Sequence, residues 1–257
     1  MNQMDSCEKK DAIYKSLKKA MDLLDFFTLE NPEWSISDLS RVSGLYKSNI
    51  YSILTTLAMC GYIEQDVGSE KYRLGTKLLT KSNVVLSYMN ELDVVHKALK
   101  EISEQVPEWL FFAILRFDEV LYLDSYIPQK SNSSAHYIKG RTAPIYCTGI
   151  GKALYSACPD GSIALPDAPF QSYTPNTITS LEKFYEDIQK TRERGYSIDN
   201  MEHEYGIKCV GVPIFNHHGQ LFGAISASGP SLRFTQEKIE FYATVLIEKA
   251  IQLKLQL

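Results

Sequence analysis

The sequence lacks any apolar run long enough to cross a membrane. The longest uninterrupted run extends from Trp109 to Leu115, whereas a membrane-spanning helix needs roughly 20 apolar residues. Residues 1–10 also lack the apolar segment that forms the core of a secretory signal peptide. We therefore expect a cytoplasmic protein that makes no membrane contact.

Cysteines are few, odd in number and scattered along the chain: Cys7, Cys60, Cys147, Cys158 and Cys209. No two of them form a C-x-x-C pair, so the pattern favours neither a disulfide framework nor a zinc site. The adjacent His217 and His218 stand between two predicted strands and precede a glycine, which is typical of a turn. We expect no metal and no cofactor.

An excess of positive charge is also missing. The chain has 27 Lys and Arg against 31 Asp and Glu, a formal net charge of −4, which does not favour nucleic acid. Locally the balance differs, because no acidic residue occurs between Leu39 and Ile63. A phosphate backbone would meet no repulsion along that stretch.

The acid-free stretch has the pattern of two helices joined by a tight turn. Ser37 is the expected N-cap of the first helix, and Leu39 and Val42 are its expected apolar edge. Gly44 can take the left-handed conformation that ends this helix. After the turn, apolar residues recur at helical spacing and predict the buried face of a second helix: Ile50, Ile53, Leu54 and Leu57.

The opposite face of the second helix is polar. A helix-turn-helix places the N-terminal part of its second helix in the major groove, where Asn pairs with adenine edges and Lys with guanine. Asn49 and Lys47 are therefore our candidates for base contacts. The candidates for phosphate or accessory contacts are Arg41, Tyr46, Ser48, Tyr51, Ser52 and Thr55. An ordinary solvated helix would carry the same kind of polar face.

The flanking residues favour the DNA-binding interpretation. Two short predicted strands surround a turn at Gly68-Ser69, and the returning strand carries Lys71 and Arg73. A basic hairpin after two helices is typical of a winged helix. Ahead of the motif, an apolar stripe predicts a third helix: Ile13, Leu17, Ala20, Leu24 and Phe27.

The remainder of the chain predicts a second domain of a different kind, in which strands alternate with helices. The expected strands span 109–116, 120–125, 208–215 and 220–228, and the expected helices span 149–157, 181–194 and 236–252. We expect a winged helix-turn-helix domain, mostly α with a β wing, over 10–76, a linker helix over 77–91 and an α+β domain over 92–257.

Small polar residues indicate a ligand site in this second domain. Thr148 is expected to cap a helix whose first N–H groups, at Gly149 and Ile150, are free to bind a small anion. On the predicted strands Ser226 and Ser228 share one face by the two-residue period. Inward hydroxyl groups need a hydrogen-bonding partner, and a polar ligand would supply one.

Two further residues belong to this predicted site. Asp199 could accept a hydrogen bond from a ligand, and Cys209 lies on one strand face with Gly211. Cys209 on its own is more typical of a small buried core residue. A cysteine-dependent hydrolase or acyltransferase would use Cys209 as nucleophile with His203 or Asp199 as helper, although no oxyanion arrangement is evident.

Three blocks of residues stand out for their order and spacing: Gly44-Leu-Tyr-Lys-Ser-Asn-Ile-Tyr-Ser-Ile-Leu54 with Tyr72-Arg-Leu-Gly75; Pro144-Ile-Tyr-Cys-Thr-Gly-Ile-Gly-Lys-Ala-Leu154; and Gly195-Tyr-Ser-Ile-Asp199 with Glu204-Tyr-Gly-Ile-Lys-Cys-Val-Gly-Val-Pro213 and Ser226-Ala-Ser-Gly-Pro230. From Tyr14 to Leu253 the chain resembles the IclR family of bacterial transcription regulators. The resemblance implies a GAF-like effector domain after the winged helix and a homodimer or homotetramer.

The resemblance also implies an effector-contacting set that matches the site above: Ala143, Gly149, Ile150, Asp199, Cys209, Ser226 and Ser228. The family often has Thr and Arg where this chain has Asn49 and Ser52, and Pro at the place of Tyr46, so the operator sequence does not carry over. We expect a repressor that binds operator DNA, and not an enzyme. A small organic acid in the second domain would alter operator binding. A protein-interaction module is the third possibility.

Overall fold

The computed structural model describes residues 14–127 and 138–257. The chain divides into two compact units, with the division between Met89 and Asn90. Within the described residues, no helix is both long enough and apolar enough to span a bilayer.

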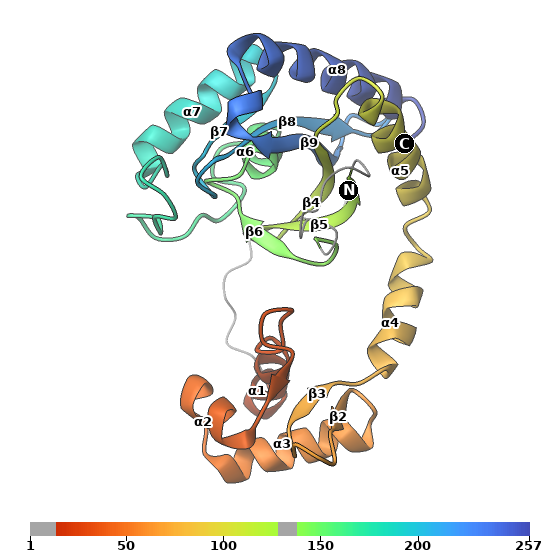
Figure 1. Ribbon diagram of the computed structural model, residues 1–257, viewed down its shortest axis with the longest axis vertical. Helices are drawn as coiled ribbons and strands as arrows, with labels where there is room; N and C mark the ends of the chain where they lie inside the picture. Colours follow the sequence, from red (N-terminus) through yellow and green to blue (C-terminus); the bar gives the residue numbers. More distant parts are fainter. Residues whose placement is uncertain (1–13, 128–137) are drawn as a thin grey trace. The chain divides into compact units, whose positions relative to one another are not determined.

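The first unit consists of helices and a small antiparallel sheet (Figure 1). Its elements are α1 (Lys15–Leu24), β1 (Glu33–Trp34), α2 (Ile36–Ser43), α3 (Lys47–Met59), β2 (Ile63–Gln65), β3 (Tyr72–Leu74) and α4 (Lys77–Leu86). The strands lie in the order β1-β3-β2. Helices α2 and α3 with the β2–β3 hairpin form the winged helix-turn-helix that the sequence predicted.

The core of the first unit lies between α1, α2, α3 and the sheet. Its buried members are Leu23, Phe27, Leu39, Ile50, Leu54, Leu57, Ile63 and Tyr72. The predicted face of α3 is confirmed, because Ile50 and Leu54 are fully buried and Leu57 nearly so. This burial turns the polar face of α3 to the surface.

Three details of the sequence prediction are wrong in this unit. Ser35, and not Ser37, caps α2: its Oγ accepts from the Asp38 N–H at 3.1 Å and donates to the Asp38 carboxylate. Val42 is 46% exposed, because the short α2 buries only Leu39. Leu17 is 56% exposed because only the second half of α1 contacts the core, while Ile13 lies outside the described residues.

The second unit is built on one antiparallel sheet with strand order β6-β5-β4-β9-β8-β7. Its elements are α5 (Glu91–Ser103), β4 (Trp109–Arg116), β5 (Glu119–Tyr126), β6 (Thr142–Pro144), α6 (Gly149–Ser156), α7 (Leu181–Arg194), β7 (Ser197–Asn200), β8 (Ile207–Phe215), β9 (Leu221–Pro230), a 3-10 turn (Ser231–Arg233) and α8 (Gln236–Lys254). This mixed α/β fold confirms the predicted α+β, GAF-like class.

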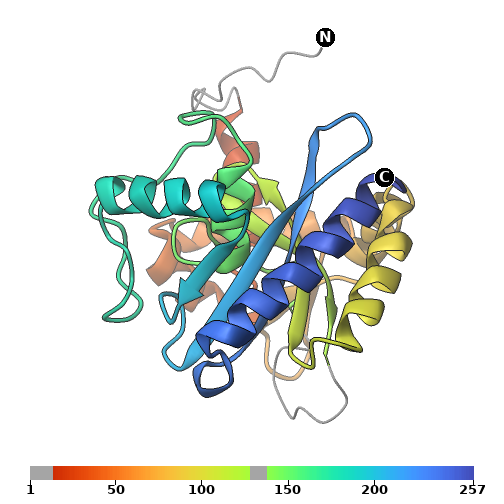
Figure 2. The same ribbon diagram turned by 90° about the horizontal axis from the view of Figure 1, so that it is seen from above.

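Helices cover both faces of this sheet. Figure 2 shows α5 and α8 side by side across one face, and residues of both contribute to the larger core. Helices α6 and α7 belong to the core on the other face. Along β4 the side chains alternate between the two cores: Leu110 and Phe112 belong to the first, and Phe111 and Ala113 belong to the second.

Leu54→Ala tests how much the buried face of α3 stabilises the first unit. Because Leu54 is fully buried, we expect a loss of about 2–5 kcal/mol in the free energy of unfolding. Met59→Ala on the same helix is the control, since Met59 is 85% exposed and should cost no more than about 0.5 kcal/mol. Urea unfolding followed by Trp34 fluorescence in a Trp109→Phe background measures both; equal losses would contradict the assigned core.

Candidate DNA-binding surface and ligand cavity

A tight turn positions the second helix of the helix-turn-helix. Helix α2 ends at Gly44, which has a left-handed φ of 70°, and its N–H donates to the Ser40 carbonyl. Two residues later the extended backbone of Tyr46 begins α3. The first turn of α3 contains no acidic residue, so the positive end of its dipole is not neutralised by its own side chains.

The residues predicted to contact DNA lie on the surface of the first unit. Those exposed are Arg41, Tyr46, Lys47, Ser48, Asn49, Tyr51, Ser52, Lys71 and Arg73, and Thr55 is half-buried. Tyr46 is 80% exposed and Tyr51 is 56% exposed. The polar side of α3 is thus accessible, as a groove-binding helix requires.

Two of the predicted cations have carboxylate neighbours. Arg41 lies 2.8 Å from Asp38, and Arg73 lies 3.5 Å from Glu64 across the hairpin. Both carboxylates fall just outside the acid-free stretch, and the sequence did not predict either contact. Exposed pairs of this kind contribute little free energy, so a phosphate can compete for either arginine.

The tip of the hairpin is held by one aspartate. The Asp66 carboxylate accepts from the Ser69 N–H at 2.8 Å, from the Ser69 hydroxyl at 2.8 Å and from the Gly68 N–H at 3.2 Å. The Ser69 backbone bond holds the pKa of Asp66 below its usual value. The carboxylate therefore orders the turn that precedes Lys71.

The second unit contains a cavity of about 250 Å³. All seven residues of the predicted effector set line it: Ala143, Gly149, Ile150, Asp199, Cys209, Ser226 and Ser228. The remaining walls are formed by Trp109, Phe111, Tyr122, Ile138, Arg141, Thr142, Thr148, His203, Glu204 and Ile207. Phe111 could have been found from the alternation along β4, whereas Arg141, His203 and Glu204 lie in irregular segments without periodicity.

The start of α6 reaches the cavity because two glycines allow it to approach β8. A Cβ atom at Gly211 would lie 2.6 Å from the Gly149 carbonyl oxygen, and one at Gly149 would lie 2.9 Å from Cys209 Cβ. The Ser197 hydroxyl closes this contact by donating to the Gly149 carbonyl. Thr148 caps α6, as predicted, by accepting from the Gly151 N–H at 3.2 Å.

Asp199 is a buried carboxyl group in the cavity wall. Only 2% of the residue is exposed, and its Oδ1 accepts from the Glu202 N–H at 2.7 Å. Burial raises the pKa of Asp199 to about 7, more than the Glu202 N–H and the charge of Lys152 lower it. The carboxyl group therefore takes up a proton close to neutral pH.

Cys209 is a neutral thiol. Its Sγ lies 2.8 Å from the Ser228 hydroxyl, which donates to it. Burial raises the pKa of the Cys209 thiol well above its usual range, and the Asp199 carboxylate raises it further. His203 packs its ring against Tyr173, with a centroid distance of 5.1 Å. A thiol that stays protonated does not suit a nucleophile.

The adjacent histidines lie in a turn, as the sequence predicted. His217 and His218 lie in the turn between β8 and β9, and His217 Nδ1 lies 2.9 Å from the Leu257 carbonyl oxygen. Over residues 14–127 and 138–257, no group of three or more His, Cys, Asp or Glu side chains could hold a metal ion.

An exposed, acid-free α3 beside a wing, in one chain with a ligand-sized cavity, is the arrangement of a DNA-binding transcription regulator. Comparisons with known proteins agree. A model of the IclR helix-turn-helix domain matches residues 16–67, and a model of the bacterial transcriptional regulator IclR C-terminal domain matches residues 84–255. The chain belongs to the IclR family of bacterial transcription regulators, which are not enzymes.

Individual relatives extend over most of the chain. The HTH-type transcriptional regulator XynR of Escherichia coli (strain K12) is 34% identical over 221 residues, covering 84% of this chain and 86% of XynR. The transcriptional repressor IclR of the same strain is 27% identical over 245 residues, covering 94% and 89%. Nothing in these comparisons supports the cysteine hydrolase.

A solved structure shares the fold. It is an IclR homolog from Microbacterium hydrocarbonoxydans complexed with 4-hydroxybenzoate, with a TM-score of 0.74 and 20% sequence identity, covering 93% of this chain and 98% of that one.

Asp199→Asn tests the raised pKa of Asp199. Well below pH 4 the carboxyl group is protonated in both the folded and the unfolded chain, and above pH 7 it is ionised in both, at a cost to the folded one. Stability is therefore lost as pH rises from about 4 to about 7. Asn cannot ionise and keeps an oxygen for the Glu202 N–H. We expect the variant to be more stable than the natural chain at pH 8, by up to about 4 kcal/mol.

The measurement is urea unfolding at pH 5 and pH 8, followed by Trp109 fluorescence in a Trp34→Phe background. The gain should be clearly larger at pH 8 than at pH 5. A gain that is the same at both pH values would refute the titration of Asp199 in this range.

Proposed function

We propose that this protein is a cytoplasmic repressor that binds operator DNA as a homodimer or homotetramer and responds to a small organic acid. The observation that carries the proposal is the exposed, acid-free polar face of α3 beside the wing. The repressor role is supported by the relative that is named as a repressor. A helix-turn-helix reads two half-sites as a dimer, which favours a symmetric assembly.

The proposed DNA contacts divide into two kinds. Asn49 and Lys47 lie in the first turn of α3 and would contact base edges in the major groove. Lys71 and Arg73 on the hairpin would contact the adjacent phosphates. Arg41, Tyr46, Ser48, Tyr51, Ser52 and Thr55 would supply further backbone or accessory contacts.

The cavity suits a compact organic acid. The N–H groups at the start of α6, at Gly149 and Ile150, can bind a carboxylate, and a protonated Asp199 can donate to one. Ser226 and Ser228 lie two residues apart on β9 in the cavity wall, so their hydroxyl groups can bind a polar substituent of the ligand. Trp109, Phe111 and Tyr122 form an aromatic part of the wall that can pack against an apolar or aromatic part of the ligand. The 4-hydroxybenzoate bound by the relative combines a carboxylate, an aromatic ring and a hydroxyl group.

An effector changes operator binding only when it binds two arrangements of the protein with different affinity. In this proposal the acid favours the arrangement whose DNA-binding heads do not match the operator. The cavity then acts on DNA binding without any contact between the acid and the DNA.

Asn49→Ala and Lys71→Ala separate base contacts from phosphate contacts. We expect Asn49→Ala to cost about 1–3 kcal/mol at one base position, because it removes a pair with one base edge. Lys71→Ala should weaken binding to all sequences alike and flatten the salt dependence, because it removes a phosphate contact.

Fluorescence anisotropy with duplexes from upstream of the protein's own gene measures the affinity of both variants for DNA. Lys190→Ala in α7 is the control. Uniform losses from both changes would contradict the assigned roles.

Ser226→Val tests the cavity. The change removes a hydroxyl group from the cavity wall and replaces it with a larger, β-branched apolar side chain, so a polar ligand would lose both a hydrogen bond and space. We expect the response to carboxylates to disappear, with operator affinity in their absence within about twofold of the natural chain, as for a site separate from the DNA surface. Thr244→Val is the control, since Thr244 is exposed on α8. Mobility shift with a panel of carboxylates, 4-hydroxybenzoate included, gives the readout; an unaltered response excludes Ser226 from the site.

A further inference from the structure

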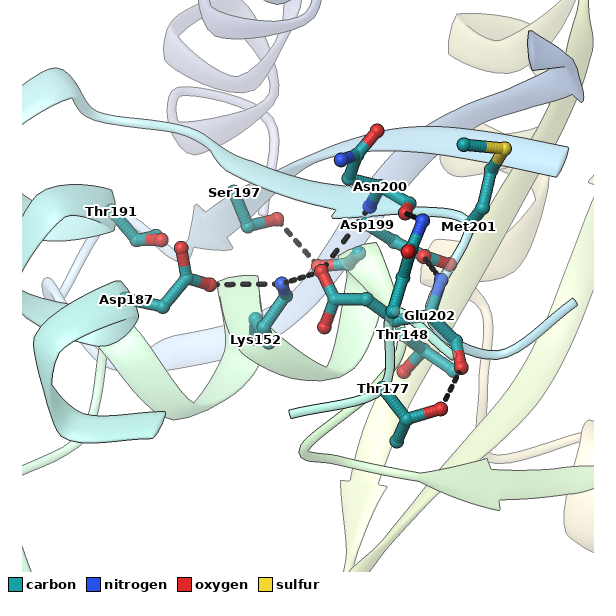
Figure 3. Close-up of polar contacts among 12 residues, drawn as sticks. Thr148, Lys152, Thr177, Asp187, Thr191, Ser197, Asp199, Asn200, Met201 and Glu202 are labelled. Carbon is teal, nitrogen blue, oxygen red and sulfur yellow. Dashed lines mark hydrogen bonds and ion pairs between the residues drawn. The ribbon is translucent and has the colours of Figure 1, made fainter. Parts of the chain in front are cut away.

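A fully buried lysine lies behind the cavity wall. The Lys152 side chain in α6 has 0% exposure, and its Nζ lies 2.7 Å from Glu202 Oε1 and 2.8 Å from Asp187 Oδ2 in α7 (Figure 3). None of these three residues is among those that line the cavity. A buried charge is tolerated only when it is paired. The two ion pairs of Lys152 therefore join α6 to α7 and to the segment after β7.

The segment that Glu202 anchors is the tight turn after β7. Glu202 Oε1 also accepts from the Asn200 N–H at 3.2 Å, and the Glu202 carbonyl accepts from the Thr177 hydroxyl at 2.6 Å. Met201 has a left-handed φ of 61°, which is unfavourable for a residue other than glycine. Such a conformation persists only when surrounding contacts fix it.

The same turn fixes the cavity carboxyl group. The Glu202 N–H donates to Asp199 Oδ1 at 2.7 Å, and Figure 3 shows that Glu202 contacts Lys152 through its carboxylate and Asp199 through its backbone. The next residues, His203 and Glu204, line the cavity. A shift of Glu202 would therefore move the partner of Asp199 and part of the wall together.

The charges around Asp199 are unbalanced. Lys152 faces three carboxyl groups, from Asp187 on α7, Asp199 on β7 and Glu202 on the turn. Arg194 lies 4.0 Å from Asp187. Further titratable groups that interact with Asp199 from other elements are the Cys209 thiol on β8, the Tyr122 hydroxyl on β5 and the Cys147 thiol before α6. Burial raises the pKa of both Asp199 and Glu202, and the Lys152 charge opposes this rise. Lys152 is thus a cation whose charge lowers the pKa of both buried carboxyl groups.

We propose, resting on the proposed function, that Lys152 is a positioning residue of the ligand site: its ion pair with Glu202 fixes the 200–202 turn, and this turn holds the Asp199 carboxyl group in the cavity. Lys152 itself makes no contact with the ligand. Its role is to keep Asp199 and the adjacent wall in the geometry that receives a carboxylate.

The test removes the charge of Lys152 together with the charges of the two carboxylates that contact it directly. Lys152→Met is combined with Asp187→Asn and Glu202→Gln in the full chain. The matched control is Arg233→Met with Glu108→Gln, which removes another ion pair of the same unit, one whose carboxylate is buried. Arg233 Nε lies 2.9 Å from Glu108 Oε1, Glu108 is 1% exposed, and neither residue lines the cavity. Thermal unfolding followed by circular dichroism establishes that each variant is folded.

The first readout needs no ligand. In the natural chain the backbone amide at position 202 should shift in the NMR spectrum as Asp199 titrates, with a midpoint near pH 7. We expect this step to disappear from position 202 in the triple variant and to persist in the control. The second readout is the affinity for 4-hydroxybenzoate from Trp109 fluorescence, which should fall at least tenfold in the triple variant and change less than twofold in the control.

A folded triple variant that keeps both the titration step and the affinity overturns the positioning role. If the triple variant does not fold, Glu202→Gln alone keeps the shape of the side chain and weakens the ion pair; a reduced step then supports the role, and an unchanged step overturns it. If no carboxylate binds the natural chain, the organic-acid proposal fails, whereas the amide titration still decides the role of Lys152.

Discussion

The close approach of α6 to β8 is the constraint on which the second unit depends. Gly149 and Gly211 leave no room for side chains between the two elements, and the Ser197 hydroxyl joins them. This contact brings the first N–H groups of α6 next to Asp199, Cys209, Ser226 and Ser228, which come from three different strands. A side chain at either glycine would push the helix start outward and separate these groups.

Local sequence patterns were sufficient to predict most helices and strands. The predicted start of α6 and the faces of two predicted strands also indicated residues that line one cavity in the structure. Helix α7 begins after Ser180 and ends at Gly195, because both ends carry their own capping signal. Where two signals compete, the sequence is ambiguous. Ser35 rather than Ser37 caps α2, because Ser35 exchanges hydrogen bonds with the backbone and the carboxylate of Asp38. The spacing of the residues alone does not distinguish the two serines.

The parts that could not be predicted depend on irregular backbone or on long-range pairing. Arg141, His203 and Glu204 reach the cavity from segments with no period to read. The Arg73–Glu64 contact follows from the register of β2 and β3, in which these residues are directly opposite. In the sequence Lys152 looks like an ordinary helix residue. Only the fold shows that its side chain is buried and pairs with two carboxylates from distant segments.

The raised pKa of Asp199 has a consequence for how the occupancy of the cavity by an anion depends on pH. An anion that settles beside the protonated carboxyl group brings a proton with it whenever the solution is near or above pH 7, so occupancy depends on the product of two concentrations. A cell that accumulates an acid and acidifies at the same time changes both factors in the same direction. If the organic acid proposed above binds in the cavity, the protein would respond more steeply to metabolic acid stress than to the same metabolite at constant pH.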